Sequence, residues 1–222
     1  MLLIFDYDGT LHDTKHLYGC ALRRVCETLA AKGYDVPKAL DDDSVSKYLG
    51  VNAPDMWNDF MPELPEEVKR SSSRAVGREM IESVLHGDAR LFDGAAEALD
   101  RLKSDGHTLV ILSNCRTGYM DAHRERFGLD RWFSDYFCAE AYGFIPKQDI
   151  FPDIIKRRGK AHIMIGDRDS DFLVGTAHGI PVIGCGYGFG TEQERKVCDI
   201  VISSPRELPD AVSRLGEKTP EE

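Results

Sequence analysis

Two aspartates lie two positions apart near the start of the chain, at the end of a short apolar segment. The segment reads Leu-Leu-Ile-Phe-Asp-Tyr-Asp-Gly-Thr-Leu over residues 2–11, which places the carboxylates at Asp6 and Asp8. Residues i and i+2 of an extended backbone point to the same side, so both carboxylates can face one site. One acid there could attack a phosphorus atom while the other donates a proton to the leaving oxygen and later activates water. A solvated Asp-Gly turn is the alternative interpretation of this pattern taken alone.

Polar residues also follow later apolar segments. Ser113 and Asn114 end one such segment, where a hydroxyl group could donate a hydrogen bond to a phosphoryl oxygen. Lys147 follows another and is predicted to lie in a loop, where its ammonium group could neutralise a phosphoryl group and hold Asp6 in place. Each signal is weak in isolation, because a Ser-Asn turn and a solvated loop lysine are both common.

A further pair of acids, Asp167 and Asp171, follows the apolar segment that ends at Gly166. If a helix starts there, the two carboxylates stack on one face and repel each other by roughly 0.2–0.5 kcal/mol. Mg²⁺ would offset that repulsion, since it binds through one or two carboxylates and keeps waters and a phosphate oxygen. The alternative is an acidic first helical turn that the helix dipole favours.

Short strand patterns alternate with helical patterns through most of the chain. The strand patterns are continuous apolar runs, which is typical of strands buried on both faces of a parallel sheet. Helical patterns include residues 93–104, with Asp93 as the expected N-cap, 117–127 and 149–158. The alternation predicts a doubly wound, parallel-sheet (Rossmann-like) α/β core. The strand patterns cover residues 2–6, 108–113, 137–140, 162–166, 181–184 and 199–203.

Residues 15–87 break this alternation. They contain no strand pattern, and prolines separate helical patterns over residues 16–32, 43–49, 55–61 and 66–85. An all-helical block inserted after the first strand is typical of a lid, with hinges at residues 11–14 and 86–90. The predicted organisation is therefore an α/β catalytic core of residues 1–14 and 88–222 with an inserted helical cap domain of residues 15–87.

The composition restricts the classes of partner. The 222 residues carry a formal net charge of −10 without a basic stripe, which argues against a nucleic-acid partner. No apolar run approaches the roughly 20 residues that a membrane span needs, and the N-terminus lacks the basic and small-residue features of a signal peptide. These features, with six cysteines that form no C-x-x-C pair, predict a cytoplasmic protein with buried thiols and no membrane partner. No feature of the sequence indicates an oligomeric state.

In order along the chain, these motifs match the pattern D-x-D-G-[TV], Ser/Thr, Lys/Arg and G-D-x-x-x-D, each at the end of a strand pattern. In this the chain resembles the haloacid dehalogenase-like (HAD) hydrolase superfamily over its whole length, since residues 15–87 are similar to the helical cap of that family. Residues 94–114 and 180–188 resemble its phosphoglycolate-phosphatase-like branch. The resemblance implies a Mg²⁺-dependent phosphatase that hydrolyses a small phosphorylated metabolite through an aspartyl-phosphate intermediate.

The resemblance also implies metal-binding and catalytic roles at the matching positions. Asp6 would be the nucleophile and a Mg²⁺ ligand. Asp8 would be the acid–base residue and would lend its backbone carbonyl group to the metal. Asp167 would be a further Mg²⁺ ligand, and Asp171 would bind the metal either directly or through another ligand.

Substrate contacts are implied for Thr10, Ser113, Asn114 and Lys147, of which Ser113 and Lys147 would bind the phosphate. The third motif departs from the family pattern. Relatives often read Lys-Pro-x-Pro there, whereas this chain reads Pro-Lys-Gln-Asp over residues 146–149. Lys147 is therefore the motif residue that matches the family least well.

Other activities remain open at this point. The alternatives are a sugar phosphomutase, which shares the aspartyl-phosphate chemistry, and a pyrophosphatase on the same fold. A mutase must clamp a bisphosphate, and the expected substrate-facing loop over residues 50–61 contains no basic residue, which favours hydrolysis. Asp8 argues against a dehalogenase, and the full set of motif residues argues against a non-catalytic binding module. Phosphoglycolate, pyrophosphate, small sugar phosphates and nucleoside monophosphates all stay candidate substrates.

Two weaker patterns have interpretations of their own. His12 and His16 are four positions apart, but without a third ligand we interpret them as a solvated pair beside the hinge. Glycines alternate with other residues over 184–190. They lack the G-x-G-x-x-G spacing of a dinucleotide site and predict a loop near the active site instead.

The cap is expected to supply substrate specificity. Lys47, Asn52 and Trp57 are the cap residues that we expect near the substrate pocket. Residues 71–73, all serine, are expected to form a solvated face of the last cap helix.

Overall fold

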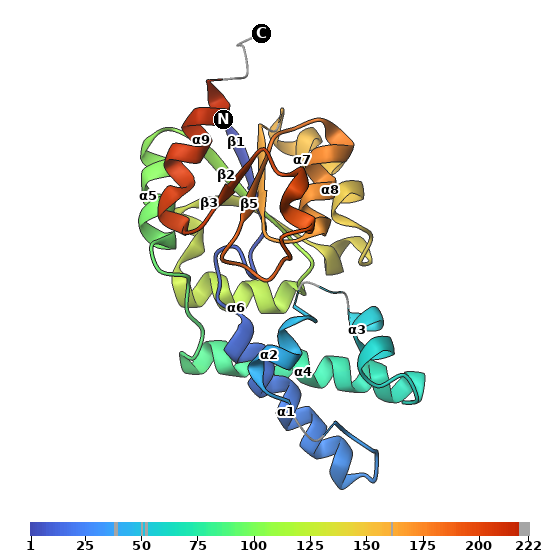
Figure 1. The fold of residues 1–222 in the computed structure, drawn as a ribbon. Coiled ribbons are helices and arrows are strands. Elements are labelled where there is room, and N and C mark those ends of the chain that lie inside the picture. The colour runs from blue at the N-terminus through green and yellow to red at the C-terminus, as the bar shows by residue number, and fades with distance from the viewer. Residues whose placement is uncertain (38–39, 50, 52, 161, 218–222) are drawn as a thin grey trace.

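Parallel strands form one sheet at the centre of the molecule (Figure 1). The strands are β1 (Leu2–Phe5), β2 (Thr108–Ser113), β3 (Phe133–Cys138), β4 (Ile163–Gly166), β5 (Val182–Cys185) and β6 (Ile200–Ile202). The computed structural model describes residues 1–37, 40–49, 51, 53–160 and 162–217, and its strands lie in the order β3-β2-β1-β4-β5-β6. β1 pairs with β2 on one side and with β4 on the other, so the strand order reverses beside β1. This confirms the predicted doubly wound sheet.

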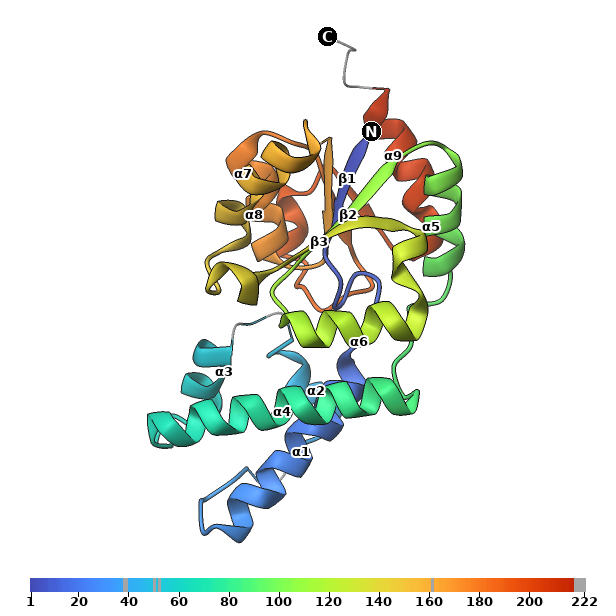
Figure 2. The same cartoon turned by 180° about the vertical axis from the view of Figure 1, so that it is seen from behind.

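Helices cover both faces of the sheet, as Figures 1 and 2 show from opposite sides. They are α5 (Ala95–Ser104), α6 (Thr117–Phe127), α7 (Lys147–Arg158), α8 (Asp169–His178) and α9 (Leu208–Gly216). Leu3 and Phe5 of β1 pack into a core with α5, α6 and α9, whereas Leu2 and Ile4 pack into a second core with α7 and α8. Because successive residues face opposite cores, the strand is apolar at every position.

The third strand begins earlier in the chain than its sequence pattern predicts. The pattern indicates residues 137–140, but β3 runs over Phe133–Cys138 and a 3₁₀ helix, η2 (Ala139–Tyr142), follows it. β3 is an edge strand with β2 as its neighbour, so Ser134 and Asp135 at its start keep contact with solvent. A half-exposed edge does not require the apolar run that marks a buried strand.

Two helices begin elsewhere than predicted. Asp93 does not cap α5, because the residue directly before this helix is Gly94, whose φ is 82°. The Asp93 carboxylate pairs instead with Arg206 at 3.1 Å. α7 begins at Lys147, two residues before the prediction, so this lysine lies in a first helical turn and not in a loop. Pro146, extended at ψ of 147°, precedes it and sets the direction in which the helix leaves the loop.

Residues 15–86 form a separate layer of helices, here called the helical unit. Its members are α1 (Lys15–Ala31), α2 (Asp42–Ser46), α3 (Ala53–Phe60) and α4 (Glu66–His86). They bury their own apolar cluster, which includes Leu22, Trp57 and Val76. The unit lies beyond the carboxyl ends of the strands, and α4 contacts α6 of the sheet layer (Figures 1 and 2). Across the described ranges, no helix combines the length and apolarity that crossing a bilayer requires.

Candidate active site

Three neighbouring strands end at the same edge of the sheet, and polar residues stand at each end. Asp6 and Asp8 follow β1, Ser113 ends β2, and Asp167 follows β4. Because β1 lies between β2 and β4 in a parallel sheet, these residues meet although they are far apart in the sequence. The fold therefore brings together the polar residues that the sequence marks at separate strand ends.

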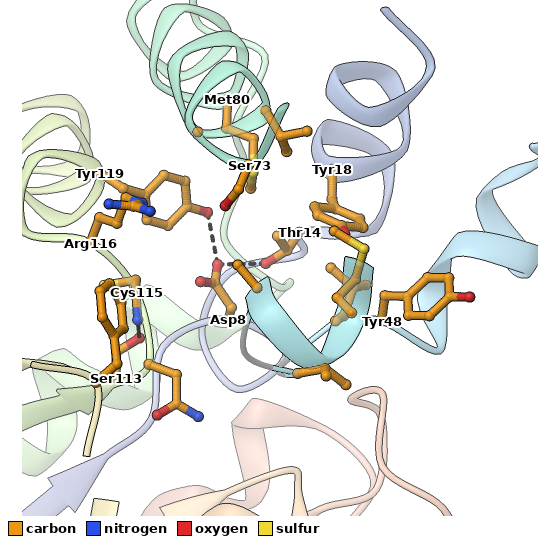
Figure 3. Close-up of a pocket in the computed structure, with 18 of the residues that line it drawn as sticks. Asp8, Thr14, Tyr18, Tyr48, Ser73, Met80, Ser113, Cys115, Arg116 and Tyr119 are labelled. Atoms are coloured by element: carbon orange, nitrogen blue, oxygen red, sulfur yellow. Dashed lines mark hydrogen bonds between the residues drawn. The ribbon is translucent and has the colours of Figure 1, made fainter. Parts of the chain in front are cut away.

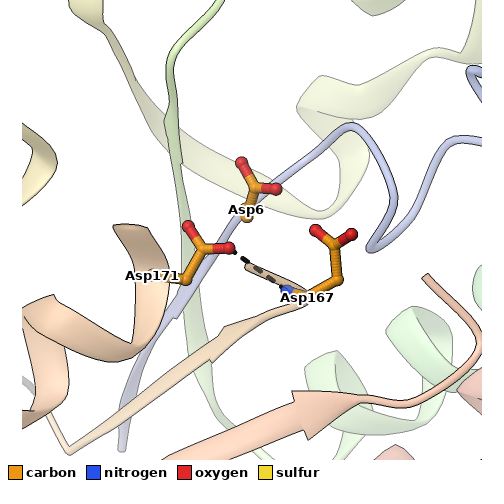
Figure 4. A group of neighbouring side chains, drawn as sticks. All are labelled: Asp6, Asp167 and Asp171. Carbon is orange, nitrogen blue, oxygen red and sulfur yellow. Dashed lines mark hydrogen bonds between the residues drawn. The ribbon is translucent and has the colours of Figure 1, made fainter. Parts of the chain in front are cut away.

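Asp6, Asp167 and Asp171 form a buried carboxylate cluster (Figure 4). One oxygen atom from each carboxylate lies within 4.8 Å of those from the other two. Lys147 places its Nζ 2.6 Å from Asp6 Oδ1 and 2.6 Å from Asp171 Oδ1. The lysine that matches the family pattern least well thus bridges two acids of the cluster.

The start of α8 fixes the other side of the cluster. The backbone N–H groups of Asp167 and Arg168 both donate to Asp171 Oδ2 at 3.1 Å. Arg168 is extended at φ of −118° and ψ of 163°, so the helix begins after it. Asp167 and Asp171 therefore do not stack on one helical face as predicted, because Asp171 caps the helix that Asp167 precedes.

Burial controls the electrostatics of this cluster. It raises the pKa of Asp6 well above the usual value, the charge of Asp171 raises it further, and Lys147 acts in the opposite direction. Burial and the charge of Asp171 raise the pKa of Asp167 to about 7. Burial lowers the pKa of Lys147, but the charges of Asp171 and Asp6 outweigh burial and leave it above its usual value. Lys147 is therefore a cation. Its single positive charge does not balance the charges of the three carboxylates.

The cluster fits a divalent cation. Asp167 Oδ1 is buried and makes no hydrogen bond within the described part of the chain, while its Oδ2 accepts one from the backbone N–H of Phe189 at 2.7 Å. A buried oxygen without a partner costs free energy that a cation would recover. Lys147 offsets one of three carboxylate charges, and an ion of charge +2 would offset the other two. Carboxylate oxygens are the ligands that Mg²⁺ prefers.

The glycine-rich loop after β5 closes over Asp167. A Cβ atom added at Gly188 would collide with the Asp167 side chain, and one at Gly190 would collide with the Asp167 carbonyl oxygen. The glycines thus allow the backbone to approach a carboxylate, which explains a spacing that does not match a dinucleotide site. The loop lies near the site, as the sequence predicts.

Asp8 lies in the same cavity and has partners of its own (Figure 3). Its Oδ1 accepts hydrogen bonds from Thr14 Oγ1 at 2.6 Å and Tyr119 Oη at 2.8 Å, and lies 2.9 Å from His12 Nδ1. Burial raises the pKa of Asp8, but the hydrogen bonds from His12 and Thr14 and the charge on His12 outweigh burial and lower it. Asp8 is therefore ionised and held through Oδ1, which leaves Oδ2 for a reacting group.

The prediction that His12 is solvated is wrong. Its side chain is fully buried, with its ring centroid 4.4 Å from that of His123. Tyr7 Oη lies 2.7 Å from His123 Nδ1 behind it. The backbone turns after Asp8, and the N–H of His12 donates to the Tyr7 carbonyl at 3.0 Å. This turn places the His12 side chain beside Asp8. The four-residue spacing of Asp8 and His12 across an Asp-Gly turn is the signal that could have indicated this contact.

A cavity of about 190 Å³ joins the carboxylates to the helical unit. Ser113, Asn114 and Lys147 line it from the sheet side together with Asp6, Asp8 and Asp171. Side chains of α1, α3 and α4 and of the segment between α2 and α3 line the other side (Figure 3). The largest side chains of this second wall are Tyr18, Tyr48, Met56, Trp57 and Met80.

Some expected contacts lie elsewhere. Thr10 is fully buried and does not line the cavity. The chain turns away from the cavity after Gly9, and Tyr187 Oη donates to the Thr10 carbonyl. Lys47 lies at the surface, with its Nζ 3.1 Å from Asp59. Asn52 lies outside the described residues. The serine run at 71–73 is not a fully solvated face, since Ser72 is buried and Ser73 lines the cavity.

Comparison of the sequence with known proteins shows the family to which this chain belongs. The sequence profile of the family described as haloacid dehalogenase-like hydrolase matches residues 3–185. The chain is 30% identical to a 5′-nucleotidase of Pseudomonas aeruginosa, over 86% of this chain and 85% of that protein. It is 31% identical to a phosphoglycolate phosphatase of Agrobacterium fabrum, over 85% of this chain and 81% of that protein.

Solved structures share the fold. A predicted phosphoglycolate phosphatase from Haemophilus somnus has a TM-score of 0.80 at 22% identity, over 95% of this chain and 97% of that one. A predicted phosphatase from Clostridium acetobutylicum has a TM-score of 0.82 at 22% identity, over 96% and 98%. At 22% identity the likeness to these structures establishes only the fold. The family assignment rests on the sequence profile, which covers most of the chain. The chain therefore belongs to the haloacid dehalogenase-like hydrolase family, on the branch that contains phosphoglycolate phosphatases.

Proposed function

We propose that this hydrolase is a Mg²⁺-dependent phosphatase that acts on a small phosphorylated metabolite through an aspartyl-phosphate intermediate. The observation that carries the proposal is the contact of Lys147 Nζ with Asp6 Oδ1 at the edge of the carboxylate cluster. It holds one oxygen of Asp6 and leaves Oδ2 to act as the nucleophile. The names of the curated relatives, a phosphoglycolate phosphatase and a 5′-nucleotidase, support the same class of reaction.

In the first step, Asp6 Oδ2 forms a bond to phosphorus while the bond from phosphorus to the leaving oxygen breaks. Ser113 and Asn114 at the end of β2 line the same cavity and would donate hydrogen bonds to the phosphoryl oxygens. The ammonium group of Lys147 would offset part of their charge. Burial raises the pKa of Asp6, whereas Lys147 acts in the opposite direction and so favours the ionised carboxylate that attacks phosphorus.

Asp8 would move the proton in both steps. It is ionised in the free enzyme, because its hydrogen bonds lower its pKa. The negative charge of an arriving phosphate ester raises the pKa of a neighbouring carboxyl group, so Asp8 binds a proton with the substrate. That proton goes to the leaving oxygen in the first step. The ionised Asp8 then takes a proton from the water that attacks the aspartyl-phosphate.

Asp6, Asp167 and Asp171 would hold the metal, with the backbone carbonyl group of Asp8 as a further ligand. Mg²⁺ bound there would offset the negative charge of the phosphoryl oxygens, so that a carboxylate can approach phosphorus. The unpaired Asp167 Oδ1 and the incomplete charge balance around the cluster support this assignment.

We assign residues 15–87 to a cap domain and residues 1–14 and 88–222 to the catalytic core. Both walls of the cavity are needed to enclose a substrate, since the carboxylates come from the sheet side and the largest apolar side chains from the helical unit. Closure would exclude water while the phosphoryl group is transferred and would admit it for the second step.

The charges of the cavity favour hydrolysis over the mutase alternative. A mutase must bind a second phosphate group, which requires cations on the cap side. The arginines that line the cavity, Arg116 and Arg168, come from the sheet side and pair with Glu140 at 2.7 Å and Glu194 at 3.2 Å. A pyrophosphatase would require the same excess of positive charge around its leaving phosphate.

The proposal is tested with the purified 222-residue chain and p-nitrophenyl phosphate. We expect turnover with Mg²⁺, loss of turnover in excess EDTA, and recovery when Mg²⁺ is restored. Asp6→Asn is the matched control, since it keeps the shape of the side chain and removes the nucleophilic oxygen. Turnover that is equal with Mg²⁺ and with EDTA would contradict the proposed metal dependence. Activity in Asp6→Asn would contradict the aspartyl-phosphate route.

A further inference from the structure

The wall that the helical unit contributes to the cavity is apolar and aromatic. Its main side chains are Tyr18, Tyr48, Met56, Trp57, Val76 and Met80. Among the described lining residues of this unit there is no lysine, arginine or histidine, and Ser73 is the short polar side chain. The Tyr48 hydroxyl donates to Asp59 at 2.8 Å, so that hydroxyl is already paired. A leaving group that meets this wall therefore meets carbon atoms, ring faces and the Trp57 Nε1–H group, which has no partner within the described residues, but no cation.

The described cations that line the cavity already have acidic partners. Lys147 lies between Asp6 and Asp171 at 2.6 Å from each. Arg116 and Arg168 pair with glutamates, as described above. A substrate with a second anionic group, beyond its phosphate, would have to share one of these cations with its acidic partner or place its charge against carbon. Either choice costs free energy, since a desolvated charge without a counter-ion is strongly unfavourable.

Phe144 adds an aromatic ring to the sheet side of the same cavity. Its φ of 60° is the one left-handed backbone angle at a non-glycine residue in the described chain, and such a conformation is uncommon for a bulky side chain. The side chain is 46% exposed although it lines the cavity, and the Arg116 guanidinium group lies 5.4 Å from its ring centroid. A large exposed apolar ring held in this way is suited to contact a ligand.

We propose that the enzyme selects phosphate monoesters whose leaving group is an uncharged alcohol that carries an aromatic ring, and that it discriminates against carboxylated leaving groups such as glycolate. This inference rests on the proposed phosphatase function. A ring gains contact with the aromatic wall, while a carboxylate loses its water there without gaining a cation. A nucleoside belongs to the favoured class, and glycolate, which the names of several relatives imply, belongs to the other.

The selectivity is measured with three matched pairs of substrates that differ by one group. Phosphoglycolate is compared with hydroxyethyl phosphate, and carboxyphenyl phosphate with phenyl phosphate, so each pair isolates a carboxylate. A nucleoside monophosphate is compared with ribose phosphate, which isolates the base. In each pair we expect kcat/KM to be about tenfold or more higher for the member without the carboxylate or with the aromatic base.

The outcomes separate this inference from the function on which it rests. If phosphoglycolate is hydrolysed as well as or better than hydroxyethyl phosphate, the inference is overturned and the phosphatase assignment stands. If ribose phosphate matches the nucleoside monophosphate and hydroxyethyl phosphate matches phenyl phosphate, the ring preference is overturned. If no ester of the panel is hydrolysed with Mg²⁺ present, the proposed function itself is contradicted.

Ser73 offers a way to change the charge of the wall. Ser73→Lys places a cation in the cavity, and Ser73→Met is the control of similar length without charge. We expect Ser73→Lys to raise kcat/KM for phosphoglycolate relative to hydroxyethyl phosphate by about tenfold, and Ser73→Met to leave that ratio as it was. Equal ratios in the two variants would overturn the argument that missing positive charge sets the selectivity.

Phe144 tests the aromatic part of the inference. Asparagine tolerates the left-handed backbone conformation, so Phe144→Asn removes the ring without adding backbone strain. We expect this variant to lower kcat/KM for phenyl phosphate several-fold more than for hydroxyethyl phosphate, with an unchanged midpoint of thermal unfolding. Equal losses on both substrates would remove Phe144 from the contact with the leaving group.

Discussion

His12 Nδ1 lies 2.9 Å from Asp8 Oδ1, and the His12 side chain is fully buried. Thr14 and Tyr119 donate hydrogen bonds to the same oxygen, so residues from two separate elements fix one carboxylate. A proton donor is effective when its oxygen faces the leaving group, and small displacements reduce the rate strongly. His12 therefore acts as a positioning residue for Asp8, at the point where the chain leaves β1 for the helical unit.

Replacement of His12 by leucine should affect alkyl phosphates most. Their leaving oxygen needs a proton, whereas p-nitrophenolate leaves almost without one, so a misplaced Asp8 matters less for p-nitrophenyl phosphate. We expect a loss in kcat/KM of roughly ten- to a hundredfold for an alkyl phosphate and a smaller loss for p-nitrophenyl phosphate. His12→Asn, whose amide can donate from near the Nδ1 position, should recover part of the difference, and His16→Leu serves as the control. Equal losses on both substrates would reduce His12 to a structural role.

The two motif aspartates should differ in the severity of their replacement. Asp6→Asn removes the nucleophile, so turnover should fall to background. Asp8→Asn should lose about 10²–10⁴-fold with an alkyl phosphate, which is the usual contribution of a general acid or base. The loss should be smaller for p-nitrophenyl phosphate in single-turnover measurements of the first step. The assignment of Asp8 as the proton donor fails if the two substrates lose the same factor.

Removal of Lys147 should destabilise the metal-free protein. Lys147→Met keeps the length of the side chain but leaves Asp6 and Asp171 buried without their cation. Breaking a buried ion pair on one side costs roughly 3–5 kcal/mol, and we expect a loss of this order in urea unfolding with EDTA present. Lys156→Met, on the last turn of α7, is the control for the substitution itself. An unchanged free energy of unfolding in Lys147→Met would show that the pair adds nothing to folding.

The raised pKa of Asp167 predicts the pH dependence of metal-free stability. Folding moves this pKa from 3.8 to about 7, so the folded state binds more protons than the unfolded state in this range. Stability therefore falls as the pH rises from about 4 to about 7, and the raised pKa of Asp6 acts in the same direction.

Urea unfolding of the wild type and of Asp167→Asn, at about pH 5 and pH 8 in EDTA, checks this prediction. The wild type should lose stability relative to the variant at the higher pH. Mg²⁺ should stabilise the wild type more at the higher pH, because the ionised carboxylates bind it. A wild type that gains stability relative to Asp167→Asn as the pH rises would contradict the prediction.

His123 should have the opposite effect at acidic pH. Burial and the nearby His12 lower the pKa of His123 from 6.5 to about 3. The unfolded state therefore binds the proton more tightly, and stability is lost as the pH falls from about 6.5 toward 3. His123→Phe removes this titration, so its stability should fall less than that of the wild type between about pH 7 and pH 5. His86→Phe, at the exposed end of α4, is the control, and parallel profiles for wild type and His123→Phe would contradict the assignment.

The sequence by itself determined the class of fold and the identity of the central acids. Strands buried on both faces must be apolar at every position, so β1, β2, β4 and β5 are visible as continuous runs. In a parallel sheet their carboxyl ends meet at one edge, so the polar residues that follow them can be assigned to one site without knowing any distance. The start of the edge strand β3 could not be predicted in this way, because β3 has a neighbouring strand on only one side.

Tertiary structure alone decided how these residues are paired. Lys147 contacts Asp6 from the first turn of α7, which starts earlier than its apolar pattern suggests, and Asp93 pairs with Arg206 and does not cap α5. His12 is buried because α6, more than a hundred positions later, supplies Tyr119 and His123. The apolar character of the cavity wall depends in the same way on which faces of α1, α3 and α4 turn toward the sheet. Local patterns determine which residues are polar or apolar, but contacts between distant segments depend on packing that no local pattern contains.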